Sequence, residues 1–213
     1  MLEEKQLKFR IAGVTAVQRG MRCAGRALPV RHVGSVDVFL EALGHARPGD
    51  VLVVDNGGRL DEACVGDLVT LEVQKAGLHG IVIWGLHRDT DELVSIGLPL
   101  FSLGTMATGP QRLDPRPADS MQSARVGHWN ITQQDVVACD SDGVLFMPEE
   151  QLQEIMVAAT NIRETERQQA EKMRAGISLR EQTRFAEYLS ARAINPSGGF
   201  REHLRRLGRA IEE

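Results

Sequence analysis

VGDLVTLEVQKAGLHGIVIWGLHRD, residues 65–89, contains a helical pattern followed directly by the pattern of a buried strand. Apolar residues recur at helical spacing over residues 66–76, and Gly77 is a favourable residue for ending a helix. Residues 80–86 form an apolar run rich in β-branched side chains, as in a strand that is covered on both faces. This order of elements indicates an α/β domain.

The flanking sequence extends the same alternation. GDVLVVDNGG, residues 49–58, predicts a buried strand over residues 50–54 that ends in Asn-Gly-Gly turn chemistry. A short helical pattern precedes it at residues 38–43. We expect further strands within the ranges 98–103, 136–137 and 144–147.

The pattern changes to helices after Pro148. Pro148-Glu149-Glu150 is a good helix start, and the helical spacing that follows continues to Gly176. Residues 178–181, Ser-Leu-Arg-Glu, form a capping box, and a last amphipathic pattern covers 200–211. We therefore predict an α/β core over residues 1–150 and a helical tail over 151–213 that packs on a neighbouring subunit.

Composition is that of a soluble globular protein. Hydrophobic residues make up 42% and charged residues 25% of the 213, with a formal net charge of −4. The charge gives no basic footprint, so nucleic acid is an unlikely partner. We find no signal-peptide pattern at the start and no apolar run long enough to span a membrane, and we expect a cytoplasmic protein.

The three cysteines, Cys23, Cys64 and Cys139, are widely separated and form no Cys-x-x-Cys motif. We expect three buried or half-buried free thiols and no soft-metal site.

The candidate site follows from the spacing of Asp67 and the pair Arg88-Asp89, which are separated by twenty intervening residues. A helix of about ten residues runs about 15 Å away from Asp67. The following strand returns through about 20 Å at about 3.3 Å per residue. The start of the helix and the end of the strand should therefore meet at one edge, with Asp67 close to Arg88 and Asp89.

That edge would suit an oxyanion and a hard cation. A helix N-terminus offers unpaired N–H groups, and Gly66 lets a ligand approach the backbone. Arg88 offers a planar fork for a carboxylate or enolate, while Asp67 and Asp89 are oxygen ligands for Mg²⁺ or Mn²⁺. The alternative is a surface ion pair between Arg88 and Asp89, with Asp67 as a helix-cap acid. Asp91 and Glu92 crowd further acid into the turn, which favours a bound cation.

The same segments resemble a known family. GDVLVVDNGG, residues 65–93 and LFSLGT at 100–105, together with CDSDGVLFMPEE at 139–150, are similar to the RraA-like family. This family groups metal-dependent 4-hydroxy-4-methyl-2-oxoglutarate aldolases with regulators of ribonuclease E activity. The segments LREQ, FREHLRRLG and AIEE of the C-terminal region resemble a subgroup with an extended helical tail.

The resemblance implies a fold and an assembly. The fold is an α/β sandwich of the swivelling β/β/α type, here with an extended C-terminal helical tail. The family assembles as trimers or hexamers with sites between subunits.

The resemblance also implies roles for individual residues. Asp89 would contact the metal, and Asp67 would act on it through a water molecule. Arg88 would bind the pyruvyl group and steady its enolate. The backbone amides of Gly66, Asp67, Leu68 and Val69 would receive the substrate carboxylate. A further metal-binding carboxylate would come from a neighbouring subunit, with Glu202 as the candidate.

These observations lead to one leading function and one alternative. The leading hypothesis is a class II pyruvate lyase, dependent on Mg²⁺ or Mn²⁺, that cleaves a 4-hydroxy-2-oxo acid or decarboxylates oxaloacetate through a pyruvate enolate. The alternative is a non-enzymatic regulator that binds a ribonuclease. The complete Asp67, Arg88 and Asp89 set favours the enzyme.

His87, next to Arg88, has two interpretations. A histidine here could act as a general acid or base near neutral pH. We favour a loop histidine that points into solvent.

Overall fold

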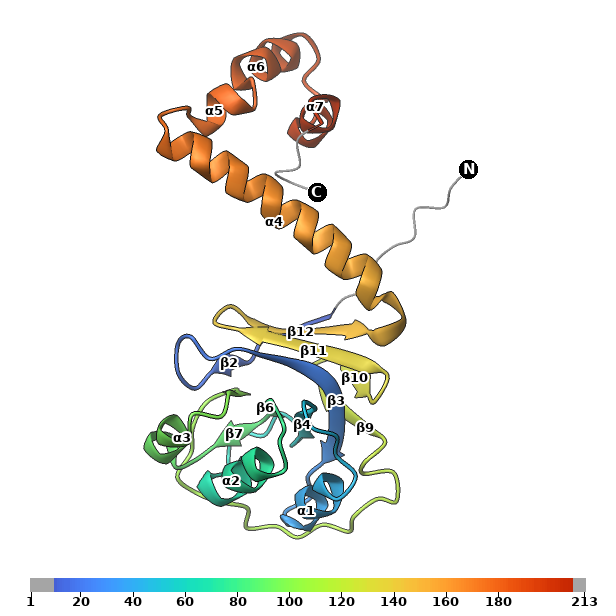
Figure 1. Ribbon diagram of the computed structural model, residues 1–213. Coiled ribbons are helices and arrows are strands. Elements are labelled where there is room, and N and C mark those ends of the chain that lie inside the picture. The colour runs from blue at the N-terminus through green and yellow to red at the C-terminus, as the bar shows by residue number, and fades with distance from the viewer. Residues whose placement is uncertain (1–9, 209–213) are drawn as a thin grey trace. The chain divides into compact units, whose positions relative to one another are not determined.

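An eight-stranded sheet forms the centre of the first of two units into which the chain divides, residues 1–152 and 153–213 (Figure 1). The computed structural model describes residues 10–208. The boundary predicted at residue 150 lies two residues before the observed division. Each unit is described by itself.

The strands of the large sheet come from both ends of the first unit. In spatial order they are β1 (Arg10–Ala12), β12 (Gly143–Pro148), β11 (Asp135–Asp140), β3 (Cys23–Arg31), β4 (Val51–Asp55), β6 (Gly80–Trp84), β8 (Leu100–Ser102) and β2 (Thr15–Ala16). The middle strands β3, β4, β6 and β8 are parallel, and the outer strands pair antiparallel. β4 is buried at every position, which explains its continuous apolar sequence.

Two short ladders lie outside this sheet. β9 (Ser123–Val126) and β10 (Trp129–Thr132) form an antiparallel pair. β5 (Ala63–Val65) and β7 (Leu86–His87) pair in parallel. Because β5 leads into the next helix and β7 leads into Arg88, this second ladder holds the two halves of the candidate site side by side.

Three helices cover one face of the large sheet (Figure 1): α1 (Asp37–Leu43), α2 (Asp67–Lys75) and α3 (Thr90–Ile96). Val38, Phe39 and Val73 from these helices join sheet residues in one buried cluster. On the other face, Val126 and Ile131 of the β9–β10 pair join a second cluster. The layers are thus strand pair, sheet and helices, and the predicted β/β/α sandwich is confirmed.

Most of the predicted elements of the first unit are present, and the structure adds helix α3 and the strands β1, β2, β3, β5, β9 and β10. Residues 80–86 do not form one strand, because the ladder changes at Gly85. A Cβ added there would lie 2.8 Å from Cβ of Asn56, so only glycine fits at position 85. The long strand β3 and the β9–β10 pair lack the apolar runs by which the other strands are recognised. Helix α3 follows the site acids and was not predicted.

The second unit is helical, as expected. η1 (Glu149–Gln151) leads into α4 (Leu152–Arg174), followed by α5 (Leu179–Gln182), α6 (Phe185–Ile194) and α7 (Phe200–Arg206). The predicted capping box is present: Ser178 Oγ accepts a hydrogen bond from Glu181 N, and a Glu181 carboxylate oxygen accepts one from Ser178 N. Rings of Phe185, Tyr188 and Phe200 pack together. Of the 23 residues of α4, none is buried within the described chain.

Among the helices within residues 10–208, none combines the length and apolar character needed to cross a membrane.

Candidate functional site

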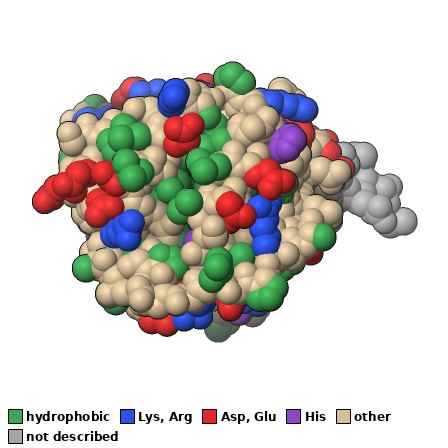
Figure 2. Space-filling model, turned by 90° about the horizontal axis from the view of Figure 1, so that it is seen from below, with side chains coloured by type: hydrophobic (Ala, Val, Ile, Leu, Met, Phe, Trp, Pro, Cys, Tyr) green, Lys and Arg blue, Asp and Glu red, His purple; other side chains and the backbone are tan. Residues whose placement is uncertain are grey.

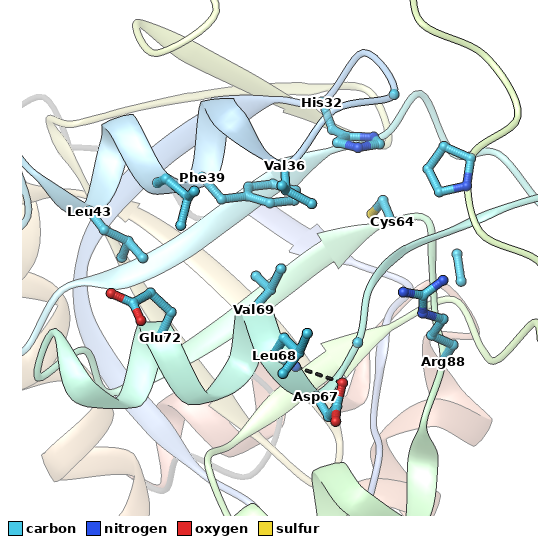
Figure 3. A pocket seen from close by; sticks show the side chains of 15 residues that line it. His32, Val36, Phe39, Leu43, Cys64, Asp67, Leu68, Val69, Glu72 and Arg88 are labelled. Atoms are coloured by element: carbon cyan, nitrogen blue, oxygen red, sulfur yellow. Dashed lines mark hydrogen bonds between the residues drawn. The ribbon is translucent and has the colours of Figure 1, made fainter.

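A pocket of about 330 Å³ lies between α1 and the start of α2 (Figure 3). Phe39, Leu43 and Val69 line one part of the pocket, where Glu72 lies beside Leu43, and Asp67 and Arg88 line another part. The pocket is large enough for a small organic acid. Figure 2 shows hydrophobic side chains at several places on the face seen from below, with acidic and basic side chains between them.

The turn before α2 consists of a glycine, Gly66, and an aspartate, Asp67, whose carboxylate accepts a hydrogen bond from the backbone of the helix. Gly66 is the extended N-cap residue of α2. The first carboxylate oxygen of Asp67, Oδ1, accepts a hydrogen bond from Leu68 N at 2.7 Å (dashed in Figure 3). Leu68 is 75% exposed, whereas Val69 packs against the buried cluster. The helix N-terminus therefore carries an anion already, in the form of a carboxylate of its own chain.

Asp89 closes the site from the other side. Its φ of 58° and ψ of 45° lie in the left-handed region, which is uncommon for a residue other than glycine and typical of strained functional positions. Its Oδ2 atom lies 3.4 Å from Asp67 N, which donates a hydrogen bond to it. A Cβ added to Gly66 would lie only 2.3 Å from the same oxygen. The carboxylate thus occupies space that exists only because residue 66 has no side chain.

Arg88 lies between these groups and the solvent. Its backbone N donates to Val65 O at 3.0 Å, which fixes where the side chain starts. Its Nε lies 3.3 Å from Asp89 Oδ2, and the side chain is 46% exposed. The guanidinium also lines the pocket together with Asp67 (Figure 3). Gly66, Asp67, Arg88 and Asp89 therefore share one edge, although their chemical roles stay predictions.

His87 is not the solvent-facing histidine that the sequence interpretation favours. It is 5% exposed, with Nδ1 2.8 Å from Ser102 Oγ and Nε2 3.1 Å from Thr90 Oγ1. Burial lowers its pKa below the ordinary value, so the ring is neutral at physiological pH. The interpretation was wrong because His87 is the second residue of β7 rather than part of a loop.

A buried polar network behind the pocket has no counterpart in the sequence-based interpretation. Arg112 Nε donates to Glu62 Oε1 at 3.0 Å, and Arg112 Nη2 donates to Asn56 Oδ1 at 3.0 Å. His32 Nδ1 lies 2.9 Å from the same Asn56 oxygen, and its ring stacks on Phe39. Burial lowers the pKa of His32. These residues are scattered over eighty positions and match no motif, so only the fold reveals that they support the site.

Glu202 belongs to the other unit. It lies in α7 and is exposed. The prediction that it completes a site on another copy stays a prediction.

The described residues contain no group of three or more histidine, cysteine, aspartate or glutamate side chains arranged to hold a metal ion. Asp67 and Asp89 make a pair of oxygen donors at one glycine. A hard cation that takes one or two protein carboxylates and keeps its waters would be served by such a pair. Binding of a metal ion by Asp67 and Asp89 therefore stays a prediction.

The chain is similar to proteins of one family. The family model described as RraA-like, Aldolase/RraA, matches residues 3–146. Protein DlpA of Legionella pneumophila is 31% identical over 130 residues, 61% of this chain and 21% of that protein. A protein of Alcanivorax borkumensis, provisionally named 4-hydroxy-4-methyl-2-oxoglutarate aldolase, is 38% identical over 74 residues, 35% of this chain and 46% of that protein.

The matched part of the chain thus spans about a fifth of the length of Protein DlpA and about half of the length of the Alcanivorax borkumensis protein. Among solved structures, Streptomyces coelicolor RraAS2 has a TM-score of 0.64 and 27% identity. The match covers 78% of this chain and 85% of that one. RraAS2 is described as an unusual member of the RNase ES inhibitor RraA protein family.

Proposed function

This chain belongs to the RraA-like family, and we propose that it is a divalent-metal-dependent carbon–carbon lyase acting on 2-oxo acids through a pyruvate enolate. The substrates would be a 4-hydroxy-2-oxo acid such as 4-hydroxy-4-methyl-2-oxoglutarate, or oxaloacetate. One observation carries the proposal: Arg88 and the Gly66–Asp67 turn line one pocket, and the Asp89 carboxylate contacts both of them. The provisional name of the Alcanivorax borkumensis relative supports the aldolase reaction.

The substrate would lie with its charged end against Arg88. A guanidinium matches a carboxylate or an enolate with two parallel N–H donors, and Arg88 is half-exposed at the pocket rather than buried in a structural ion pair. At the start of α2, Asp67 N and Leu68 N already donate to carboxylates of the chain itself, so the Gly66 and Val69 amides are the proposed second group of donors for the substrate carboxylate. Donors fixed before the reaction begins stabilise the developing negative charge, which usually contributes most to catalysis of this kind.

This chain supplies two carboxylates for the predicted cation, and the proposed further ligand would come from a neighbouring subunit. Asp89 would hold Mg²⁺ or Mn²⁺ directly and Asp67 would act through water, with Glu202 of a neighbouring subunit as a proposed further ligand. A Cβ at residue 66 would fill the space that Asp89 uses, so the chain keeps that carboxylate accessible. When bound, the ion would polarise the 2-oxo group as a Lewis acid.

Asp67 is the group that we propose to hold the transferred proton. Its Oδ1 atom is occupied by Leu68 N, and within residues 10–208 its Oδ2 atom has no hydrogen-bond partner. A carboxylate with one fixed and one open oxygen is oriented and still able to accept a proton. This role needs no other titratable group, because His87 is occupied on both ring nitrogens.

The test measures pyruvate release from both substrates in a coupled assay. The chelated protein should be inactive, and Mg²⁺ or Mn²⁺ should restore activity. Arg88→Ala should lower kcat/KM by about 10²–10³-fold. Arg19→Ala is the matched control, because Arg19 is exposed and lies outside the pocket. Full activity of Arg88→Ala would contradict the proposal.

Metal binding needs its own readout. Titration of Mn²⁺ followed by electron paramagnetic resonance should show a site that Asp89→Asn weakens by at least about tenfold, since a carboxylate ligand is lost. Asp91→Asn removes the same charge two residues away and is the control. Equal binding by all three proteins would remove Asp89 as a ligand.

A second candidate function rests on the similarity to Streptomyces coelicolor RraAS2, whose family is described as RNase ES inhibitors. A regulator would bind a ribonuclease, would be indifferent to Mg²⁺ and would tolerate Asp89→Ala. The lyase is favoured because Asp67 and Arg88 line one pocket and Asp89 contacts both residues. Inhibition of a ribonuclease by the Asp89→Ala protein, without pyruvate release by the unaltered chain, would favour the regulator.

We propose that the enzyme is a homo-oligomer, a trimer or a hexamer. Helix α4 supports this, because none of its residues is buried within residues 10–208 and Met156, Val157 and Ile162 are exposed. Light scattering coupled to size exclusion measures the assembly. A monomer at working concentration would contradict the proposal, and activity of that monomer would remove Glu202 from the metal site.

A further inference from the structure

Two of the three cysteines lie directly opposite each other on neighbouring strands. Cys23 begins β3, Cys139 lies in β11, and the two residues are register partners in this antiparallel ladder. Side chains of directly opposite residues point to the same face of a sheet. Both cysteines accordingly pack in or against the same buried cluster.

The spacing of such partners permits a disulfide. Opposite residues in an antiparallel pair have Cα atoms about 4.5–5.5 Å apart, and disulfides span about 4.4–6.8 Å. The Cβ atoms would need to approach from about 4.5–5.5 Å to about 3.8 Å, so the bond would carry strain. Strained disulfides are the readily reduced ones, which suits a reversible modification rather than a permanent link.

The pair is open to a reagent on one side. Cys23 and Cys139 both line a groove of about 810 Å³, and Cys23 is partly exposed. The groove is also lined by the charged side chains of Arg22, Asp140 and Asp142. The Cys139 thiol donates a hydrogen bond that lowers the pKa of Cys23, which gives Cys23 more of the reactive thiolate.

We propose that Cys23 and Cys139 form a thiol-pair modification site that reacts with small disulfides, such as oxidised glutathione, to give an intrachain disulfide. The Cys23 thiolate attacks the reagent and forms a mixed disulfide, releasing one glutathione thiolate. Cys139 then loses its proton to that thiolate and attacks Cys23 Sγ, releasing the second glutathione. In total the protein loses two hydrogens and two electrons, and one oxidised glutathione becomes two reduced molecules.

Cys64 is a built-in comparison. It is buried, its S–H donates to Leu86 O, and burial raises its pKa well above the usual range. It lies among the residues of the other buried cluster, so it cannot reach the pair. A thiol reagent should therefore modify Cys23 at least about tenfold faster than Cys64 in the folded protein.

The test treats the folded, full-length protein with oxidised glutathione, quenches with acid and counts thiols after denaturation. Three thiols should fall to one, the mass should fall by two hydrogen atoms, and peptide mapping should find residue 23 linked to residue 139. Cys64→Ser should fall from two thiols to none. Cys139→Ser should instead keep one glutathione on Cys23. A reductant should reverse each change.

Three outcomes would overturn the proposal. These are no reaction, a stable glutathione adduct on Cys23 of the unaltered protein, or a bond that joins two chains. Peptide mapping of the unaltered protein decides the matter even if a serine variant fails to fold. The result is independent of the proposed lyase function, because neither cysteine lines the candidate pocket.

Discussion

In the first unit Phe39, Phe101 and Phe146 are fully buried, whereas α4, which leads into the second unit, has no buried residue within the described chain. The first unit therefore contains two apolar clusters on the faces of one sheet, and its site lies at the edge of a rigid framework. The second unit has a small aromatic group around Tyr188 and exposes Met156 and Ile162. The comparison shows that the first unit is stabilised by its own buried core, whereas side-chain burial within one chain contributes little to the stability of α4.

The largest expected effect is on the free energy of unfolding, when a large side chain is removed from the core of the first unit. Phe146→Ala should lower the free energy of unfolding by about 3–5 kcal/mol, because the side chain is fully buried in the cluster behind β12. Urea unfolding followed by tryptophan fluorescence reports on this unit, since Trp84 and Trp129 both belong to it. Met156→Ala is the counterpart in α4 and should change the value by no more than about 0.5 kcal/mol. An equal loss in both variants would mean that the stability of the first unit depends on α4.

The next effect compares two helix-capping glycines. Gly66→Ala should lower kcat/KM about 100-fold, because its Cβ would displace the Asp89 carboxylate and shift Arg88. Gly199, the residue before α7, has open space around it and an ordinary φ of −78°, so Gly199→Ala should leave activity unchanged. Steady-state kinetics on both variants, with circular dichroism to verify folding, makes the comparison. Unchanged kinetics in Gly66→Ala would separate this turn from catalysis.

Acid should weaken the two units in different pH windows. Burial lowers the folded-state pKa of His87 and His32 below the usual 6.5, so the unfolded chain binds more protons as the pH falls. Stability of the first unit should therefore decline from about pH 6.5 downward, toward the lowered folded pKa values.

In the second unit, the hydrogen bond from Ser178 lowers the pKa of Glu181 below its usual 4.5, so that contribution persists until about pH 4.5 and is lost below it. Unfolding midpoints at a series of pH values measure both windows. His87→Gln should reduce the slope of the first window without abolishing it, because His32 remains. His45→Gln, at an exposed position, should leave the slope as it is. A first unit whose midpoint is constant down to about pH 5 would contradict the expectation.

The smallest effect concerns the capping box of α5. Ser178→Ala should cost about 1 kcal/mol, because it removes the oxygen that accepts from Glu181 N. The loss should appear in the amide hydrogen exchange of residues 179–182 and not in that of β4. Ser178→Asn, which keeps a capping acceptor, should retain most of the protection. Faster exchange across β4 as well would show that the two units unfold together.

Where sequence reasoning worked, a local pattern was enough. The apolar runs of β4 and β6 identified buried strands, because both faces of these strands are covered and must be apolar. The spacing between Asp67 and Arg88 predicted that their elements return to one edge, since a helix and a strand of known rise per residue span similar lengths. β3 was missed because its first half is only partly buried and carries Gly25 and Arg26, so no continuous apolar run marks it.

Other features depended on contacts that no local pattern encodes. His87 was assigned to a solvent-facing loop, yet its ring lies between Ser102 and Thr90. The network of Glu62, Arg112 and His32 joins three distant segments and gives no signal in any one of them.

By itself, the sequence determined the α/β class of the first unit, the helical character of the second and the set of charged residues at one turn. Those properties follow from periodicity and from the residue types that single elements require. Only the tertiary structure decided that Asp89 adopts a left-handed backbone against the bare Gly66, that burial lowers the pKa of His87, and that Cys23 faces Cys139. The physical reason is that each of these depends on close packing between residues distant in the chain, and such packing is fixed only when the whole core forms.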